Sequence, residues 1–131
     1  MEIAIVIGVL IILFFGFQTY YYIKSKKTVG QEIPFNQLSN ELKNKIKDKK
    51  SIIYFFSPNC HACKQQSPVM EELKSEFKNI FMIDASRNIN DARAFNVMGT
   101  PSTVFVKENR IADVMIGFRG ENVLRKKLAN F

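Results

Sequence analysis

Cysteine and histidine are scarce in this chain of 131 residues, which contains two cysteines and one histidine. Two cysteines are too few for a disulfide scaffold, and a gap of two residues closes a loop too small to stabilise a fold through chain entropy. Zinc usually needs four ligands, whereas Cys60, His61 and Cys63 offer three, two of them adjacent. The thiols are therefore free for chemistry, and we expect neither a structural metal nor a required cofactor.

Basic residues are absent from the first 23 positions, where Glu2 is the only charged side chain. Residues 3–23 are almost wholly apolar, and a run of this length can span a hydrocarbon core of about 30 Å. A cleaved signal peptide is the competing interpretation, but the basic start and the small residues of such a peptide are both missing. We therefore expect a retained transmembrane anchor at residues 1–23, held in the lipid bilayer through residues 3–23, and a juxtamembrane linker at residues 24–34.

Three lysines, Lys24, Lys26 and Lys27, follow the apolar run directly. The positive-inside rule places such a cluster on the cytoplasmic side of a membrane. We therefore predict a single-pass protein of the cell membrane whose soluble domain faces the cytoplasm. Because lysine is frequent throughout the chain, an extracytoplasmic domain remains the alternative. The linker reaches at most about 36 Å when extended, so the domain stays near the bilayer.

The soluble part is basic, since 19 basic but only 11 acidic side chains lie at or after Lys24. No base-stacking motif or arginine-rich stripe accompanies this charge, and we expect no nucleic-acid partner. Five lysines between residues 43 and 50 lie near the anchor in sequence and could face anionic lipid headgroups. The charge therefore favours a solvated, lysine-rich surface beside a membrane.

The pattern of apolar residues after the linker alternates between the periods of helices and strands, without an internal repeat, and this predicts one α/β domain. The run "SIIYFF" is continuous, apolar and rich in β-branched and aromatic residues, as in a central strand covered on both faces. The spacing predicts strands at 51–56, 80–85, 102–106 and 111–117, the last two as an antiparallel hairpin, and helices at 35–48, from Cys60 to about Asn79, at 89–95 and from Glu121 onward.

Both thiols follow directly on the central strand, in the tetrapeptide Cys60-His61-Ala62-Cys63. Where a strand gives way to a helix, the first cysteine lies at the helix N-terminus, whose unpaired N–H groups favour a negative charge. Cys60 should therefore be an acidic thiol, and its thiolate is the attacking species. Cys63 lies one helical turn later, where it can displace a mixed disulfide from Cys60.

The chain resembles the thioredoxin family from about Phe35 to Phe131. The apolar strand before Cys-x-x-C is followed in family order by Lys64, Pro68, the segment Gly99-Thr100-Pro101, a final hairpin and Gly117. The resemblance implies a thioredoxin-like domain at residues 35–131, with a central mixed β-sheet flanked by helices. It also implies a cis Thr100–Pro101 bond beside the cysteines, where the Thr100 backbone pairs with an extended substrate segment.

Three positions depart from the pattern of the thioredoxins. A buried carboxylate usually stands six residues before the first cysteine and helps move the proton of the second, and Tyr54 occupies this position. Asn59 replaces the usual aromatic residue before the first cysteine, and His61-Ala62 replaces Gly-Pro between the two. A protonated His61 would stabilise the Cys60 thiolate and make the disulfide more oxidising, but His61 could equally be a solvated surface residue.

Two other functions fit the same residues. Two thiolates can hold copper(I), although the chain has no distant histidine to resemble the membrane-bound copper chaperones closely. A binding module could also keep the fold without turnover and hold partners in the Thr100-Pro101 groove. Covalent haem attachment is not expected, because Lys64 stands where the motif needs histidine.

The sequence therefore predicts a membrane-anchored thioredoxin-like thiol-disulfide oxidoreductase in which Cys60 attacks and Cys63 resolves. We expect its partners to be protein thiols or disulfides and an upstream electron donor or acceptor, and we expect a monomer. Reduction, oxidation and isomerisation all remain open, because the redox potential cannot be read from these residues.

Overall fold

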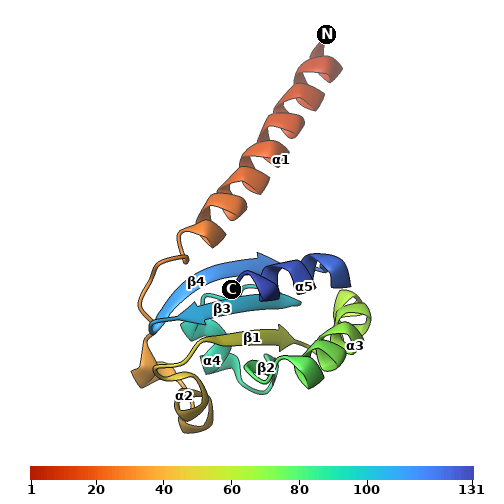
Figure 1. Cartoon of the computed structure of the whole chain (residues 1–131). Coiled ribbons are helices and arrows are strands. Elements are labelled where there is room, and N and C mark those ends of the chain that lie inside the picture. Colours follow the sequence, from red (N-terminus) through yellow and green to blue (C-terminus); the bar gives the residue numbers. More distant parts are fainter.

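A computed structural model describes the backbone of residues 1–131 and every side chain except those at positions 25 and 26. The side chain of Lys26, one of the lysines behind the predicted orientation, thus lies outside the described residues. The first element, α1 (Glu2–Lys26), is one continuous helix that projects from the rest of the chain (Figure 1). Its stretch from Glu2 to Lys24 has a mean hydropathy of 2.4 and is long and apolar enough to cross a membrane.

A mixed sheet of four strands forms the centre of the domain (Figure 1). The spatial order is β2-β1-β3-β4, in which β1 pairs parallel with β2 and antiparallel with β3, and β3 pairs antiparallel with β4. This confirms the predicted mixed sheet and its hairpin. The strand bounds are β1 (Ser51–Phe56), β2 (Ile80–Asp84), β3 (Ser102–Lys107) and β4 (Arg110–Ile116).

Alternate residues of β1 point to opposite faces of this sheet, so its apolar run places apolar side chains on both faces. Helices cover both of these faces. Ile53 and Phe55 pack on one side with α2 (Asn40–Ile46) and α4 (Ile89–Ala94). Ile52 and Tyr54 pack on the other side with α3 (His61–Glu76) and α5 (Glu121–Ala129). The continuous apolar run therefore forms a strand that is buried on both faces.

The predicted helix at 35–48 is wrong in its first part. A short 3-10 helix, η1 (Phe35–Gln37), precedes α2, and Ser39 separates the two with an extended backbone. The Ser39 hydroxyl accepts a hydrogen bond from the Leu42 N–H, while its own N–H and hydroxyl donate to the buried carboxylate of Asp91, each at 2.7 Å. Ser39 thus caps α2, and the distant Asp91 carboxylate holds the capping residue in place, a contact that local periodicity does not reveal.

Part of the predicted linker, residues 24–34, packs on the domain. The Gly30 N–H donates to the Ile111 carbonyl at 2.7 Å, and the Ile33 N–H donates to the Asn109 carbonyl at 3.1 Å. Ile33 is also buried in the core on the α2 side. The end of the linker therefore runs along the start of β4. Because residues 24–26 belong to α1, only residues 27–29 separate this helix from the first bond to β4.

We expect Leu73→Ala to lower the free energy of unfolding by about 2–5 kcal/mol, because Leu73 is fully buried between α3 and the sheet. Urea unfolding of the full chain in a zwitterionic detergent would measure the loss. Glu71→Ala, an exposed position on the same helix, should change the unfolding free energy by less than about 0.5 kcal/mol. Equal effects of the two substitutions would contradict the packing described here.

Candidate active site

Cys60 lies at the junction where β1 passes into α3. A turn at Pro58 and Asn59 follows the strand, and the Cys60 N–H donates to the Ser57 carbonyl at 3.2 Å. Cys60 then has an extended backbone and caps α3, with its Sγ accepting a hydrogen bond from the Cys63 N–H at 3.2 Å. The helix N-terminus therefore directs a backbone N–H group at this sulfur.

The two predicted cysteines are joined by a disulfide bond, with their Cα atoms 5.2 Å apart. Their environments differ. Cys60 is half-buried at the helix start, whereas Cys63 is only 2% exposed. A partner that approaches from solvent can therefore reach the Cys60 sulfur and not the Cys63 sulfur.

The segment Thr100-Pro101 lies against Cys60. The Cys60 Sγ is 3.3 Å from the Thr100 carbonyl oxygen, and the Thr100–Pro101 peptide bond is cis. The Pro101 carbonyl accepts a hydrogen bond from the Gly117 N–H at 2.8 Å, and Gly117 has a φ of 81°, which glycine adopts without strain. Within the described part of the chain, the Thr100 N–H donates to no group. The loop thus presents one free backbone donor beside the disulfide.

His61 is the first residue of α3 and is exposed to solvent. No hydrogen bond or ion pair connects its side chain with the cysteines or with any other residue that the structure describes. The structure therefore brings Cys60, Cys63, Thr100 and Pro101 into contact through bonds or short distances, and leaves His61 at the margin of this group.

Two exposed apolar side chains lie close in sequence to the loops that meet at Pro101 and were not predicted from the sequence. Met98, 64% exposed, stands two residues before Thr100, and Phe118, 44% exposed, follows the glycine that is bonded to Pro101. If the two side chains together form one exposed apolar patch, that patch would suit contact with another protein. In the sequence, each of these apolar residues stands next to a glycine, Gly99 or Gly117. This arrangement also occurs at the ends of ordinary strands, so it did not mark the two residues as exposed.

Gln66 is a second residue that the sequence did not reveal. It is buried on α3, one turn after Cys63, and its Oε1 accepts a hydrogen bond from the Arg119 N–H at 2.7 Å. This bond connects the cysteine helix with the loop after β4, which in turn holds Pro101 through Gly117. Because its partner is 53 residues away, no local motif marks Gln66.

Tyr54 is fully buried on β1, and its hydroxyl lies 3.1 Å from the Ser67 Oγ. Burial raises the pKa of the Tyr54 phenol above its ordinary value of 10, and the hydrogen bond with Ser67 opposes this only in part. Tyr54 therefore stays protonated at neutral pH and cannot serve as the base that a carboxylate would be at this position.

No group of three or more His, Cys, Asp or Glu side chains in the described residues is arranged to hold a metal ion. The groups that the structure brings together are the two bonded sulfurs, the Cys63 N–H and the Thr100 carbonyl. This arrangement suits the transfer of two electrons by disulfide exchange.

Comparison with known proteins shows that this chain is similar to thioredoxins. Residues 33–130 match the family model described as Thioredoxin. The chain is 31% identical over 75 residues to the thioredoxin of Bacillus subtilis, covering 55% of this chain and 72% of that protein. It is 27% identical over 84 residues to thioredoxin 2 of Chlorobaculum tepidum, covering 62% and 77% respectively.

A solved structure shows the same likeness in three dimensions. The thioredoxin of Fasciola hepatica superposes on this chain with a TM-score of 0.60 and 26% sequence identity, covering 69% of this chain and 88% of that chain.

We expect Tyr54→Phe to lower the free energy of unfolding by about 0.5–1.5 kcal/mol, because it removes one buried hydrogen bond. The pH midpoint of thiol reactivity between pH 6 and 9 should not change, since Tyr54 does not titrate in this range. Iodoacetamide alkylation rates across pH, with Ser67→Ala as the variant that removes the other partner, would test this. A shifted midpoint in Tyr54→Phe would show that the phenol does exchange a proton with the site.

Proposed function

This chain belongs to the thioredoxin family and is a thioredoxin-like disulfide oxidoreductase, and from that premise we propose that it is anchored in a membrane by residues 3–23 and exchanges disulfides with protein thiols through Cys60 and Cys63. The observation that carries this proposal is the unequal exposure of two bonded sulfurs, with the accessible one at a helix N-terminus.

Cys60 is the attacking residue in this mechanism. When the pair is reduced, the Cys63 N–H and the N-terminus of α3 stabilise a thiolate on Cys60. An ordinary thiol with a pKa of about 8.5 is only about 3% ionised at pH 7, whereas one with a pKa of about 6.5 is roughly 75% ionised. The helix N-terminus thus raises the amount of the reactive species.

Cys63 is the resolving residue. The Cys60 thiolate attacks one sulfur of a substrate disulfide, forms a mixed disulfide and releases the other substrate sulfur as a thiolate. Cys63 then loses its proton and attacks the Cys60 sulfur, which forms the Cys60–Cys63 disulfide and releases the second substrate thiol. Two electrons pass to the substrate, and the reverse sequence oxidises a dithiol. The burial of Cys63 restricts it to this intramolecular step.

Thr100 and Pro101 shape the substrate groove in this proposal. The free Thr100 N–H can bond to the backbone of an extended substrate segment, and the 3.3 Å between Cys60 Sγ and the Thr100 carbonyl brings such a segment to the sulfur. Met98 and Phe118 supply apolar contact on either side. His61 would bias the redox potential through its charge alone, since it has no contact with the sulfurs.

The membrane location is supported by the exposed apolar side chains of α1. The lysines after the span favour a domain that faces the cytoplasm, where reduction of protein disulfides by electrons from an upstream donor is the fitting direction. A domain on the other face would act on exported proteins. A binding module without turnover would need no resolving thiol, so the function of Cys63 separates the two hypotheses.

We expect Cys63→Ser to accumulate mixed disulfides between Cys60 and its substrates, because the resolving attack is lost. Reduction of insulin by dithiothreitol should then no longer be accelerated, and non-reducing gels should show adducts that dithiothreitol releases. Cys60→Ser is the matched control and should form none. Turnover by Cys63→Ser equal to that of the wild type would refute the exchange mechanism and favour the binding module.

We expect a membrane-impermeant maleimide to leave Cys60 unlabelled in intact cells after mild reduction, and to label it after permeabilisation. Glu2→Cys in a Cys60→Ser/Cys63→Ser background is the control, because position 2 is the first residue at the other end of the span and should be labelled in intact cells. The opposite pattern would place the domain outside and leave the exchange chemistry untouched.

A further inference from the structure

The strand β2 forms an open edge of the sheet. It pairs with β1 on one side only, and the sheet order places no strand on its other side. The segment before α2 does not cover this edge, because Gly30 and Ile33 are bonded to the chain at the start of β4, beside the opposite edge. An edge of this kind is a template for one more strand.

The direction of the backbone groups of β2 follows from the bonds at the two ends of its ladder. The Ile52 N–H donates to the Asn79 carbonyl at 2.9 Å, and the Ala85 N–H donates to the Phe56 carbonyl at 2.8 Å. Residues alternate in a parallel ladder, so the odd-numbered residues from 79 to 85 face β1 and the even-numbered ones face away. Met82 is the middle one of the residues that face away from β1. Its N–H and its carbonyl have no hydrogen-bond partner among the described residues.

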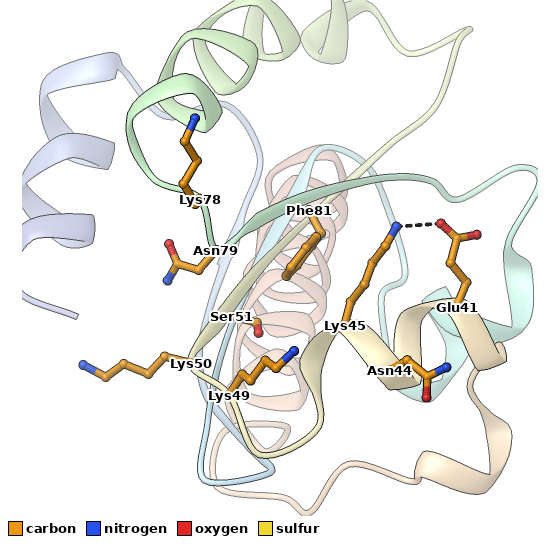
Figure 2. A pocket seen from close by; sticks show the side chains of 9 residues that line it. All are labelled: Glu41, Asn44, Lys45, Lys49, Lys50, Ser51, Lys78, Asn79 and Phe81. Atoms are coloured by element: carbon orange, nitrogen blue, oxygen red, sulfur yellow. Dashed lines mark hydrogen bonds and ion pairs between the residues drawn. The ribbon is translucent and has the colours of Figure 1, made fainter.

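Two adjoining cavities of about 650 and 160 Å³ line this edge, and we call them together the β2 groove. Phe81, Lys45 and Glu41 belong to both cavities, which makes the groove continuous along the strand. The partly exposed side chains of residues 81–83 provide apolar contact. Figure 2 shows the larger cavity, with Lys45 and Lys49 near the ring of Phe81, whereas the side chain of Lys78 points away from this ring toward α3.

Lysines dominate the charge of the β2 groove. It is lined by five of them: Lys45, Lys49, Lys50, Lys74 and Lys78. Of these, Lys45 alone forms an ion pair in the part of the chain that the structure describes. Lys50 donates a hydrogen bond to the Phe131 carbonyl and Lys78 donates to the Ser75 carbonyl, and both keep their positive charge.

The acidic side chains of the groove, by contrast, are engaged within the domain. Glu41 is paired with Lys45 at 2.6 Å, Asp84 accepts from Ser86, and Asp91 accepts from Ser39. The groove therefore presents unpaired positive charge beside unpaired backbone groups.

We propose that the β2 groove binds an extended acidic segment of a partner protein, which adds to the sheet beside β2. Backbone hydrogen bonds to Met82 would supply the register, and carboxylates of the segment would meet the lysines of the rim. The strand offers a length of about 17 Å, which suits a segment of five or six residues. This site is independent of the cysteines and of the proposed function.

An acidic partner is favoured over a second copy of this chain, because the chain carries a net charge of +7 and two copies repel each other. It is favoured over the membrane surface because α2 and β2 lie on the side of the domain away from α1 (Figure 1). The groove thus faces the space in which soluble partners diffuse.

The test uses the full chain in nanodiscs of phosphatidylcholine, which carry no net lipid charge. The probe is a fluorescein-labelled hexapeptide of alternating glutamate and valine, with a lysine-valine hexapeptide as its control. Fluorescence anisotropy should show binding of the acidic peptide only, and amide hydrogen exchange should slow at Met82 when it binds. Binding without protection of residues 80–84 would overturn the proposal.

Charge reversal locates the interaction. Lys49→Glu and Lys78→Glu should each weaken binding of the acidic peptide by about three- to tenfold, since each replaces an attraction by a repulsion. Lys126→Glu, an exposed position on α5, is the matched control and should leave binding unchanged. All three variants should keep the disulfide-exchange rate of the wild type. Equal effects of the three reversals would overturn the proposal.

Two further results would also overturn it. In one, the acidic peptide fails to bind, whereas phosphatidylserine vesicles bind the wild type more tightly than they bind Lys49→Glu or Lys78→Glu. The occupant of the groove would then be lipid. In the other, sedimentation shows a concentration-dependent dimer that protects Met82 without peptide, so that the occupant is a second copy.

Discussion

The N-terminus of a helix needs acceptors for its unpaired N–H groups, and in α3 a sulfur atom is one of them. The buried strand β1 brings the chain to this point, and the turn at Pro58 and Asn59 delivers Cys60 as the capping residue. The same hydrogen bond that completes the helix also favours negative charge on the sulfur. Fold and reactivity therefore depend on a single contact, between the Cys60 Sγ and the Cys63 N–H.

In the proposed mechanism, burial gives the two sulfurs their order of action. Cys63 is enclosed by the helix and its surroundings, while Cys60 remains open to solvent beside the Thr100 carbonyl. The loop that carries Thr100 is held in place by a relay of contacts, from Gln66 on α3 to Arg119 and from Gly117 to Pro101. The cysteine helix and the loop that carries Thr100 are thus connected by hydrogen bonds, although they are far apart in sequence.

Local patterns in the sequence were sufficient for the strands, which are continuous apolar runs, and for placing the cysteines at a helix start. The mixed sheet was predicted from the resemblance to the thioredoxin family. The sequence was not sufficient where a distant residue decides the outcome. The start of α2 depends on the Asp91 carboxylate, and the position of the loop after β4 depends on Gln66. The loops that carry Met98 and Phe118 are connected only in the folded chain, by the hydrogen bond from the Gly117 N–H to the Pro101 carbonyl. The edge of β2 is open because the segment before α2 is bonded at the start of β4, beside the opposite edge of the sheet. The periodicity of apolar residues does not predict which edge this segment joins.

The bonding of residues 30–33 along β4 shortens the tether between the apolar helix and the catalytic domain. Only residues 24–29 separate Ile23 from the first of these contacts, and they span at most about 20 Å. With α1 inserted in a bilayer, the domain explores a thin layer above the lipid rather than the bulk solution. Proteins embedded in the same membrane then encounter the disulfide at a high effective concentration, while freely diffusing proteins gain no such advantage.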